Sequence, residues 1–301
     1  MLWLLITILA YLLLAIASMG DEYLLNGLPN PKNYSFYTGT LGILILVLIP
    51  FVGFVMPSFQ LFLLCLLAGL IFVIANFFYF TALEKFELSR VAPAIGGLLP
   101  IFTFVIIFIL FGAGKTLTPS EFAAFLFLVF GSVFITMKSW KNFSLNSLLL
   151  SAAAAFLFSM TFVLSKYIYS QMPFWSGLIL MRVGSFLIAI WFIFTKEVKD
   201  ELFHKKPTFQ RKTGVIFAAN QAVGASAYVL QSWAVALVPL AFLPFINALE
   251  GIKYVFILLF VPIFAKLIPQ LSQEKNTRKI IIQKAVSIIL ICIGLYLVAT
   301  R

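Results

Sequence analysis

The amino-acid sequence predicts an all-α integral membrane protein of ten transmembrane helices, arranged as two inverted repeats of five helices each. Three observations predict this fold: a very apolar composition, ten separate apolar segments, and a partial echo between the two halves of the chain. Of the 301 residues, 63% are hydrophobic and only 10% are charged, and the mean hydropathy is +1.10. A soluble domain of this size needs a more polar surface. Outer-membrane β-strands would give short alternating segments, which this sequence lacks.

The apolar segments have the length that a membrane-spanning helix needs, since about 20 residues cross a hydrocarbon core of roughly 30 Å. Turn-forming residues separate them, for example Pro29-Asn30-Pro31 and Thr118-Pro119-Ser120. The first segment has no basic flank and many further spans follow it, which favours a transmembrane helix over a signal peptide. We expect spans at residues 2–18, 37–55, 60–83, 91–112, 119–137, 145–168, 174–195, 213–237, 242–264 and 280–299.

The two halves of the chain echo each other. A shift of 144 residues lays Pro29 on Pro173, and Pro93 matches Pro244 in the same order of spans. Each half holds an odd number of spans, so the second half must enter the membrane upside down relative to the first. That arrangement is an inverted repeat. The repeats are expected to comprise residues 1–143 and residues 144–301.

The fourth and ninth spans contain helix-breaking residues, which sets them apart from the other spans. Proline removes a backbone donor, and in lipid the freed carbonyl must find a partner inside the protein or in a wet cavity. Two interrupted spans at corresponding places of two halves are typical of a transporter's substrate path. The expected break residues are Pro93, Gly96, Gly97 and Pro100 in the fourth span, and Pro244 and Gly251 in the ninth.

Charged side chains inside the spans are the best candidates for function, because each costs about 2.5–3.5 kcal/mol at the centre of a membrane helix. In the ninth span Glu250 and Lys253 lie three residues apart on one helical face, and Asn247 lies one turn before Glu250. This strip either faces a cavity or pins the helix to a neighbour through a buried ion pair. In a cavity, Glu250 either carries a proton or stays ionised and holds a cation in place for an anionic substrate.

Arg182 is the other deep charge and lies inside the seventh span. Its guanidinium has the planar fork that suits a carboxylate or phosphate, and the alternative is a structural pairing with Glu250. Amide and hydroxyl groups in other spans either bind substrate or join helices to one another. The candidates of this kind are Asn220, Gln221 and Gln231 in the eighth span, and Asn76 and Tyr79 in the third.

Short motifs follow the same order in both halves. The first half has Tyr79-Phe80-Thr81-Ala82-Leu83, then Pro93 and Leu98-Leu99-Pro100-Ile101-Phe102, then Gly112, Leu117-Thr118 and Gly131-Ser132-Val133. The second half has Trp233-Ala234-Val235-Ala236-Leu237, Leu249-Glu250-Gly251 and Gly294-Leu295. In this order of motifs the chain resembles the EamA-type members of the drug/metabolite transporter superfamily. The resemblance implies a basket of ten helices around a central cavity, with a small organic solute as cargo.

The residues and the resemblance together predict a secondary transporter of a small polar metabolite, an amino-acid-like or other carboxylate-bearing solute. Arg182 and Lys253 favour an anionic group on the cargo. The alternatives are an exporter of cationic or amphipathic drugs, and a membrane scaffold that handles lipid or transports nothing. The expected location is the cell membrane of a bacterium, which is its inner membrane where two are present.

No enzymatic activity, metal or cofactor is expected. The sequence has one histidine, no paired metal-binding aspartates and no phosphate-binding glycine loop with its lysine. The net charge of +11 lies mostly in short connections between spans, where basic residues set topology and contact anionic lipid. The expected partners are therefore a small-molecule substrate and the lipid bilayer, with no nucleic acid, and the protein is expected to be a monomer or a homodimer. The basic connections favour both termini outside, whereas the resemblance implies cytoplasmic termini.

Overall fold

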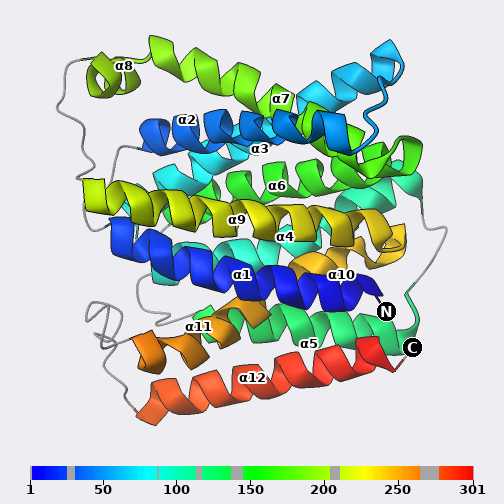
Figure 1. The fold of residues 1–301 in the computed structure, drawn as a ribbon. Helices are drawn as coiled ribbons and strands as arrows, with labels where there is room; N and C mark the ends of the chain where they lie inside the picture. Colours follow the sequence, from blue (N-terminus) through cyan, green and yellow to red (C-terminus); the bar gives the residue numbers. More distant parts are fainter. Residues whose placement is uncertain are drawn as a thin grey trace.

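The structure is a computed structural model and describes residues 2–25, 31–86, 88–112, 117–136, 145–203, 211–264 and 278–300. Within these ranges the regular backbone is helical and no strand occurs. Figure 1 shows the long helices lying side by side with their axes close to one direction. The α-helices are α1 (Leu2–Leu25), α2 (Pro31–Leu41), α3 (Phe59–Lys85), α4 (Leu88–Phe111), α5 (Pro119–Thr136), α6 (Leu145–Gln171), α7 (Phe174–Trp191), α8 (Lys196–Phe203), α9 (Arg211–Leu237), α10 (Leu243–Ala248), α11 (Gly251–Phe264) and α12 (Arg278–Ala299). The 3₁₀ segments are η1 (Gly42–Phe51), η2 (Phe192–Phe194) and η3 (Leu240–Phe242).

Eight helical segments of the described chain are long and apolar enough to cross a membrane. They are Leu2–Gly20, Phe59–Lys85, Val91–Phe111, Pro119–Thr136, Leu145–Gln171, Phe174–Phe194, Leu240–Phe260 and Ile282–Ala299. A shorter apolar helix covers Ser35–Phe51, and α9, with 27 residues, is more polar than the eight. The prediction of an all-α, multi-pass membrane protein is confirmed.

The outer surface of the bundle is apolar, as a lipid-facing surface must be. Large apolar side chains such as Leu5, Phe51, Ile109 and Trp191 are strongly exposed on it. In a soluble protein, so many exposed large apolar side chains would form an aggregation-prone surface. Around a membrane bundle, they lie against acyl chains.

Each predicted span coincides with one helix or with two or three consecutive helical segments. The second span is α2 followed by η1, and the ninth is η3, α10 and α11. Helix α8 lies in a polar stretch between spans where no helix was expected. The predicted repeat boundary between residues 143 and 144 lies outside the described residues.

The second span changes helix type at Gly42. The α2 segment has 11 residues and η1 has 10. At about 1.5 Å per residue in an α-helix and about 2.0 Å in a 3₁₀-helix, the two together extend roughly 36 Å. The 3₁₀ half therefore lengthens a short, partly polar segment to about the thickness of a bilayer's hydrocarbon core. Gly53 ends the segment with a φ of 61°, in the left-handed region that glycine tolerates.

Glycines allow α3 and α7 to cross in close contact. A Cβ atom on Gly69 would collide with the carbonyl oxygen of Met181, and a Cβ on Gly184 would collide with that of Leu66. Small residues at helix crossings let backbones approach closely in lipid, where van der Waals packing replaces the hydrophobic driving force.

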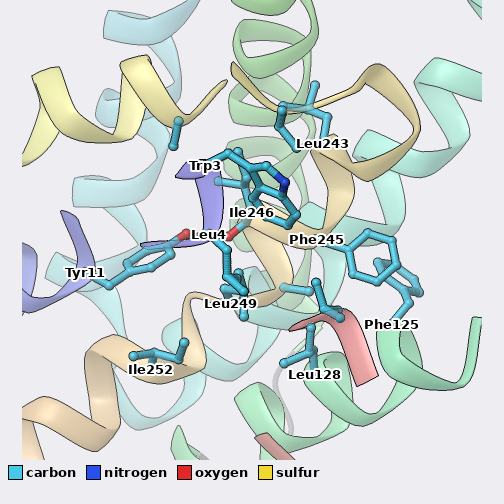
Figure 2. Packing of buried hydrophobic residues seen from close by; sticks show 14 of the residues in the cluster. Trp3, Leu4, Tyr11, Phe125, Leu128, Leu243, Phe245, Ile246, Leu249 and Ile252 are labelled. Carbon is cyan, nitrogen blue, oxygen red and sulfur yellow. Dashed lines mark hydrogen bonds between the residues drawn. The ribbon is translucent and has the colours of Figure 1, made fainter. Parts of the chain in front are cut away.

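The largest buried apolar cluster surrounds α10, as Figure 2 shows. All six residues of α10 are buried, and Phe245 packs edge-to-face on Phe125 of α5 at a centroid distance of 5.6 Å. Tyr11 of α1 also belongs to this cluster. Helix α10 is thus fixed among several neighbours, so the helix break that follows it has a defined position.

An ion pair joins the start of the second span to α8. Lys32 donates to the Glu197 carboxylate across 2.7 Å, and this hydrogen bond holds the pKa of Glu197 below its usual range. A carboxylate with a lowered folded-state pKa stabilises the fold above the unfolded-state pKa, and this contribution is lost as the pH falls through the folded-state pKa. We expect Glu197→Gln to be less stable than wild type at neutral pH, with the difference shrinking below the ordinary glutamate pKa of about 4.3. Thermal unfolding across this pH range tests it, and a pH-independent difference would contradict it.

Candidate functional site

A cavity of about 1040 Å³ lies in the middle of the bundle. It is lined by residues of α1, α2, η1, α3, α4, α6, α7, α9, α10 and α11, together with Glu250 at the helix break. All nine polar residues selected from the sequence line it: Asn76, Tyr79, Arg182, Asn220, Gln221, Gln231, Asn247, Glu250 and Lys253. Residues from both halves of the chain thus share one cavity, which has the size of a small-molecule site.

The ninth span is broken beside this cavity. Helix α10 ends at Ala248, Leu249 and Glu250 form a turn, and α11 begins at Gly251. The Glu250 amide bonds to the Asn247 carbonyl at 3.2 Å and not to that of Ile246, as an α-helix would require. The predicted break is therefore present, immediately before Gly251.

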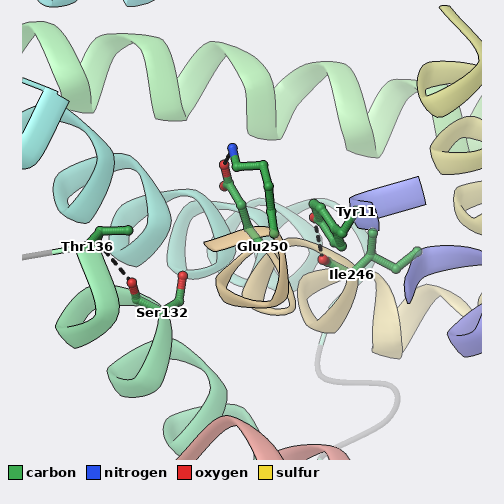
Figure 3. Close-up of polar contacts among 6 residues, drawn as sticks. Tyr11, Ser132, Thr136, Ile246 and Glu250 are labelled. Atoms are coloured by element: carbon green, nitrogen blue, oxygen red, sulfur yellow. Dashed lines mark hydrogen bonds and ion pairs between the residues drawn. The ribbon is translucent and has the colours of Figure 1, made fainter. Parts of the chain in front are cut away.

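Tyr11 of α1 compensates for the break. Its hydroxyl donates to the Ile246 carbonyl at 2.8 Å, as Figure 3 shows, which replaces the bond that the Glu250 amide no longer makes. A backbone carbonyl left without a hydrogen-bond partner in a membrane costs several kcal/mol. The hydrogen bond from Tyr11 therefore stabilises the helix break at this position.

Gly251 follows the break because α5 lies against it. A Cβ atom at this position would lie 2.9 Å from the Cα atom of Ser132 and 2.9 Å from the side chain of Ile291. A larger residue would push α11 away from α5 and α12. Pro244 lies in the first turn of α10, where its missing N–H costs no helical hydrogen bond.

The expected break in the fourth span is absent. Helix α4 runs without interruption through Pro93, Gly96, Gly97 and Pro100. Hydroxyl groups support this stretch: Ser159 of α6 and Thr103 both donate to the Leu99 carbonyl at 2.8 Å. The Ser159 hydrogen bond joins α6 to α4 beside Pro100.

The two glycines of α4 serve packing. A Cβ on Gly96 would lie 3.0 Å from the Ser132 hydroxyl oxygen, and a Cβ on Gly97 would lie 2.9 Å from Val133. They allow α4 to approach α5 closely. The prediction that these two glycines interrupt the span is therefore wrong.

Glu250 and Lys253 form an ion pair at the cavity wall. The ammonium nitrogen lies 2.9 Å from a carboxylate oxygen, and the side chains are only 19% and 14% exposed. The ammonium also lies 4.7 Å from the ring centroid of Tyr254. Figure 3 shows Glu250 at the helix break. Glu250 therefore holds Lys253, and the alternative pairing of Glu250 with Arg182 is not formed.

Arg182 is held by aromatic rings. Its guanidinium carbon lies 3.5 Å from the ring centroid of Tyr228 and 5.2 Å from that of Phe72. A Cβ on Gly42 would lie 3.1 Å from the Arg182 Cδ, so the side chain passes directly over the start of η1. The residue is only 9% exposed, and its N–H groups make no hydrogen bond or ion pair with any described residue. A buried cation at a cavity wall with donors to spare is suited to an anionic ligand.

The candidate amides differ in their surroundings. Asn76 donates to the Phe72 carbonyl of its own helix at 2.8 Å, and Asn247 donates to the Thr103 hydroxyl of α4 at 2.8 Å. The second bond joins α10 to α4, as expected of an amide that links helices. Asn220 is buried against Gly20 of α1.

The remaining candidates are partly exposed on the wall. Gln221 and Gln231 lie on α9, and Tyr79 lies on α3 with its ring 6.4 Å from that of Phe158. Their partial exposure beside the cavity makes them the candidates best able to reach a cargo.

Sequence reasoning did not select Tyr11, Tyr228, Phe72 or Gly42. A tyrosine in the middle of the first apolar span carries a hydroxyl that needs a partner in lipid, and this signal could have identified Tyr11. Phe72 and Gly42 give no such signal, because phenylalanine and glycine are common throughout the spans. Their role depends on where Arg182 lies in the folded bundle.

The chain matches no protein-family model and no curated protein. Among solved structures, 26 chains match it. One, described only as "Crystal structure of protein", aligns with 99% of this chain and 95% of its own length, at a TM-score of 0.65 and 17% sequence identity. At this identity the likeness shows that the two chains share a fold.

Proposed function

We propose that this protein is a secondary transporter that moves a small carboxylate-bearing metabolite through the central cavity. The observation that carries the proposal is Arg182, a nearly buried guanidinium at the cavity wall whose donors are not used by any described residue. A permanently charged group in the interior of a membrane is costly and marks a ligand or ion pathway. An anionic cargo offsets that cost when it binds.

The proposed architecture is ten spans in two inverted repeats. It adds α2–η1 and α9 to the eight long apolar segments. Helix α1 packs along α9, and α6 packs along α3. If α1 corresponds to α6 and α3 to α9, these are the same contact made twice, as a pseudo-two-fold axis requires.

The crossing of α5 and α12 supports the same axis. Gly131 of α5 lies against Ile291 of α12, and Gly294 of α12 lies against Leu128 of α5. Adding 163 to the residue number of Gly131 gives Gly294, and adding it to that of Leu128 gives Ile291. One shift between the repeats therefore converts the first contact into the second. The two helices run antiparallel here, as corresponding helices of inverted repeats must.

This arrangement, with a broken ninth span at a central cavity, also supports membership in the EamA-type drug/metabolite transporters, and we propose that membership with a location in a bacterial cell membrane. The charges of the described wall weigh against export of cationic drugs. Arg182 and Lys253 are basic and only Glu250 is acidic, whereas a site for cations would be net acidic. A scaffold without transport has no use for a charged cavity of this size, and we propose no enzymatic activity.

A binding screen followed by transport assays tests the proposal. Purified protein is heated with a panel of small carboxylates and with the matched amines and amides. A ligand at about 100 times its Kd stabilises the folded state by about 2.7 kcal/mol. We expect carboxylates to raise the unfolding temperature and to enter proteoliposomes that contain the protein. Stabilisation by amines alone would favour the drug exporter, and the absence of transport of every bound carboxylate would contradict a transporter.

A further inference from the structure

We propose that the cargo is a monocarboxylate with an apolar or aromatic body and without an ammonium group, so that free amino acids are poor ligands. This inference rests on the proposed function and narrows its substrate class. It follows from the charges at the cavity wall and from how each of them is already occupied.

The charge balance of the described wall leaves one positive charge without a partner. Glu250 and Lys253 neutralise each other across 2.9 Å, and Arg182 stacks on aromatic rings and makes no ion pair with a described residue. A single carboxylate on Arg182 brings the sum to zero. A zwitterion leaves the sum at plus one, and its own ammonium is then a cation without a partner in a low-dielectric cavity.

The described part of this wall offers an ammonium group one carboxylate, and that carboxylate already pairs with a cation. Glu250 is the acidic residue of the described lining, and Lys253 already occupies one of its oxygens. Asn247 has a buried side-chain oxygen without a hydrogen-bond partner, but that oxygen is a neutral acceptor and carries no charge to balance an ammonium. An ammonium bound to Glu250 would therefore share this carboxylate with Lys253 and place two cations beside one anion.

The aromatic faces beside the charged groups are also occupied. Arg182 lies over Tyr228 and Phe72, and Lys253 lies over Tyr254. A cation–π site for a cargo ammonium would have to form elsewhere on a wall that carries a net positive charge. The same charge repels an incoming amine.

The stacking also determines how a carboxylate binds. With one face of its guanidinium on Tyr228, Arg182 offers the N–H groups along its edge. A planar carboxylate accepts two parallel hydrogen bonds from such an edge. Apolar residues of α4 and α6, among them Ile95, Leu99, Phe158 and Phe162, line the same cavity and can receive an apolar body. Tyr228 and Phe72 thus act as positioning residues for the carboxylate.

Three compounds with one phenylethyl skeleton test the inference. They are 3-phenylpropionate, which has only the carboxylate, L-phenylalanine, which has carboxylate and ammonium, and 2-phenylethylamine, which has only the ammonium. Affinities are obtained from the ligand dependence of thermal unfolding of the purified full chain. We expect 3-phenylpropionate to bind at least about tenfold more tightly than L-phenylalanine, because an unpaired buried charge costs more than 1.4 kcal/mol, and 2-phenylethylamine not to bind.

A gain-of-function variant tests the reason for this preference. Gln231 lies one helical turn from Tyr228 on α9 and lines the cavity. Gln231→Glu adds a carboxylate of nearly the same shape, which can accept the ammonium of L-phenylalanine. We expect the preference for 3-phenylpropionate to shrink or reverse in this variant, while an unchanged preference would overturn the inference.

The outcomes separate this inference from the function on which it rests. If wild-type protein binds L-phenylalanine as tightly as 3-phenylpropionate, and Arg182→Gln loses both, the cavity is an Arg182-dependent carboxylate site but the inference is wrong. If 3-phenylpropionate binding is the same in wild type and Arg182→Gln, the proposed carboxylate site itself is wrong.

Discussion

Replacing Arg182 by glutamine is expected to weaken carboxylate binding by roughly ten- to a hundredfold and to reduce transport in proportion, because hydrogen bonds to charged groups contribute about 1.5–3 kcal/mol. The variant removes the guanidinium that Tyr228 and Phe72 hold at the cavity wall. Binding to purified protein and uptake into proteoliposomes measure the effect on the same preparation.

The fold should tolerate this change. The substitution loses a cation–π contact of about 0.5–2 kcal/mol, but it also removes a buried charge without an anionic partner. Unfolding without ligand is therefore the control and should change little. Arg182→Lys is the conservative variant, and we expect it to recover only part of the affinity, since an ammonium is a point charge without the planar fork. Full affinity in Arg182→Gln would rule out Arg182 as the anion site.

Replacing Glu250 by glutamine is expected to destabilise the protein by up to about 3 kcal/mol, the low end of the range for removing one partner of a buried ion pair. The loss arises because the Lys253 ammonium keeps its charge and loses the carboxylate 2.9 Å away. The low end of the range applies because both side chains retain some exposure. Chemical or thermal unfolding of the purified variant measures the loss.

The double variant Glu250→Gln with Lys253→Met is the matched control, because it removes both charges together. We expect it to regain most of the lost stability, so that the double-mutant cycle returns a coupling between the two residues. If Glu250→Gln is as stable as wild type, the ion pair contributes nothing to the fold.

The Glu250→Gln variant also separates the two roles that the sequence left open. A residue that holds Lys253 in place leaves gradient-driven uptake partly active when it is neutralised. A proton carrier, once neutralised, loses gradient-driven transport but keeps exchange of substrate across the membrane. The ion pair with Lys253 favours the first role, and reconstituted protein assayed in both modes distinguishes them.

The spans and the candidate residues could be predicted from the sequence for a clear physical reason. A membrane helix must be about 20 apolar residues long, so its position appears directly in the composition. A polar side chain in such a segment must face protein or a cavity, so Arg182, Glu250 and the amides could be selected without coordinates. The structure places all nine of these candidates along one cavity.

Whether the fourth and ninth spans are broken or continuous could be decided only from the tertiary structure. Helix α4 stays continuous through Pro93 and Pro100, and in this stretch it packs closely on α5 and accepts a hydroxyl hydrogen bond from Ser159 of α6. The ninth span breaks, and Tyr11 satisfies the carbonyl that the break frees. Proline and glycine give the same local signal in both spans, and only the neighbouring helices distinguish them.

By itself, the sequence determined that this chain is a helical membrane protein and which polar groups are candidates for a site, since hydrophobic length and the cost of a charge in lipid are local properties. The tertiary structure decided the partners. Glu250 pairs with Lys253 on its own helix, and Arg182 stacks on Tyr228 and Phe72 of two other helices. Which side chains meet depends on how helices cross, and that geometry arises from packing among residues far apart in the chain.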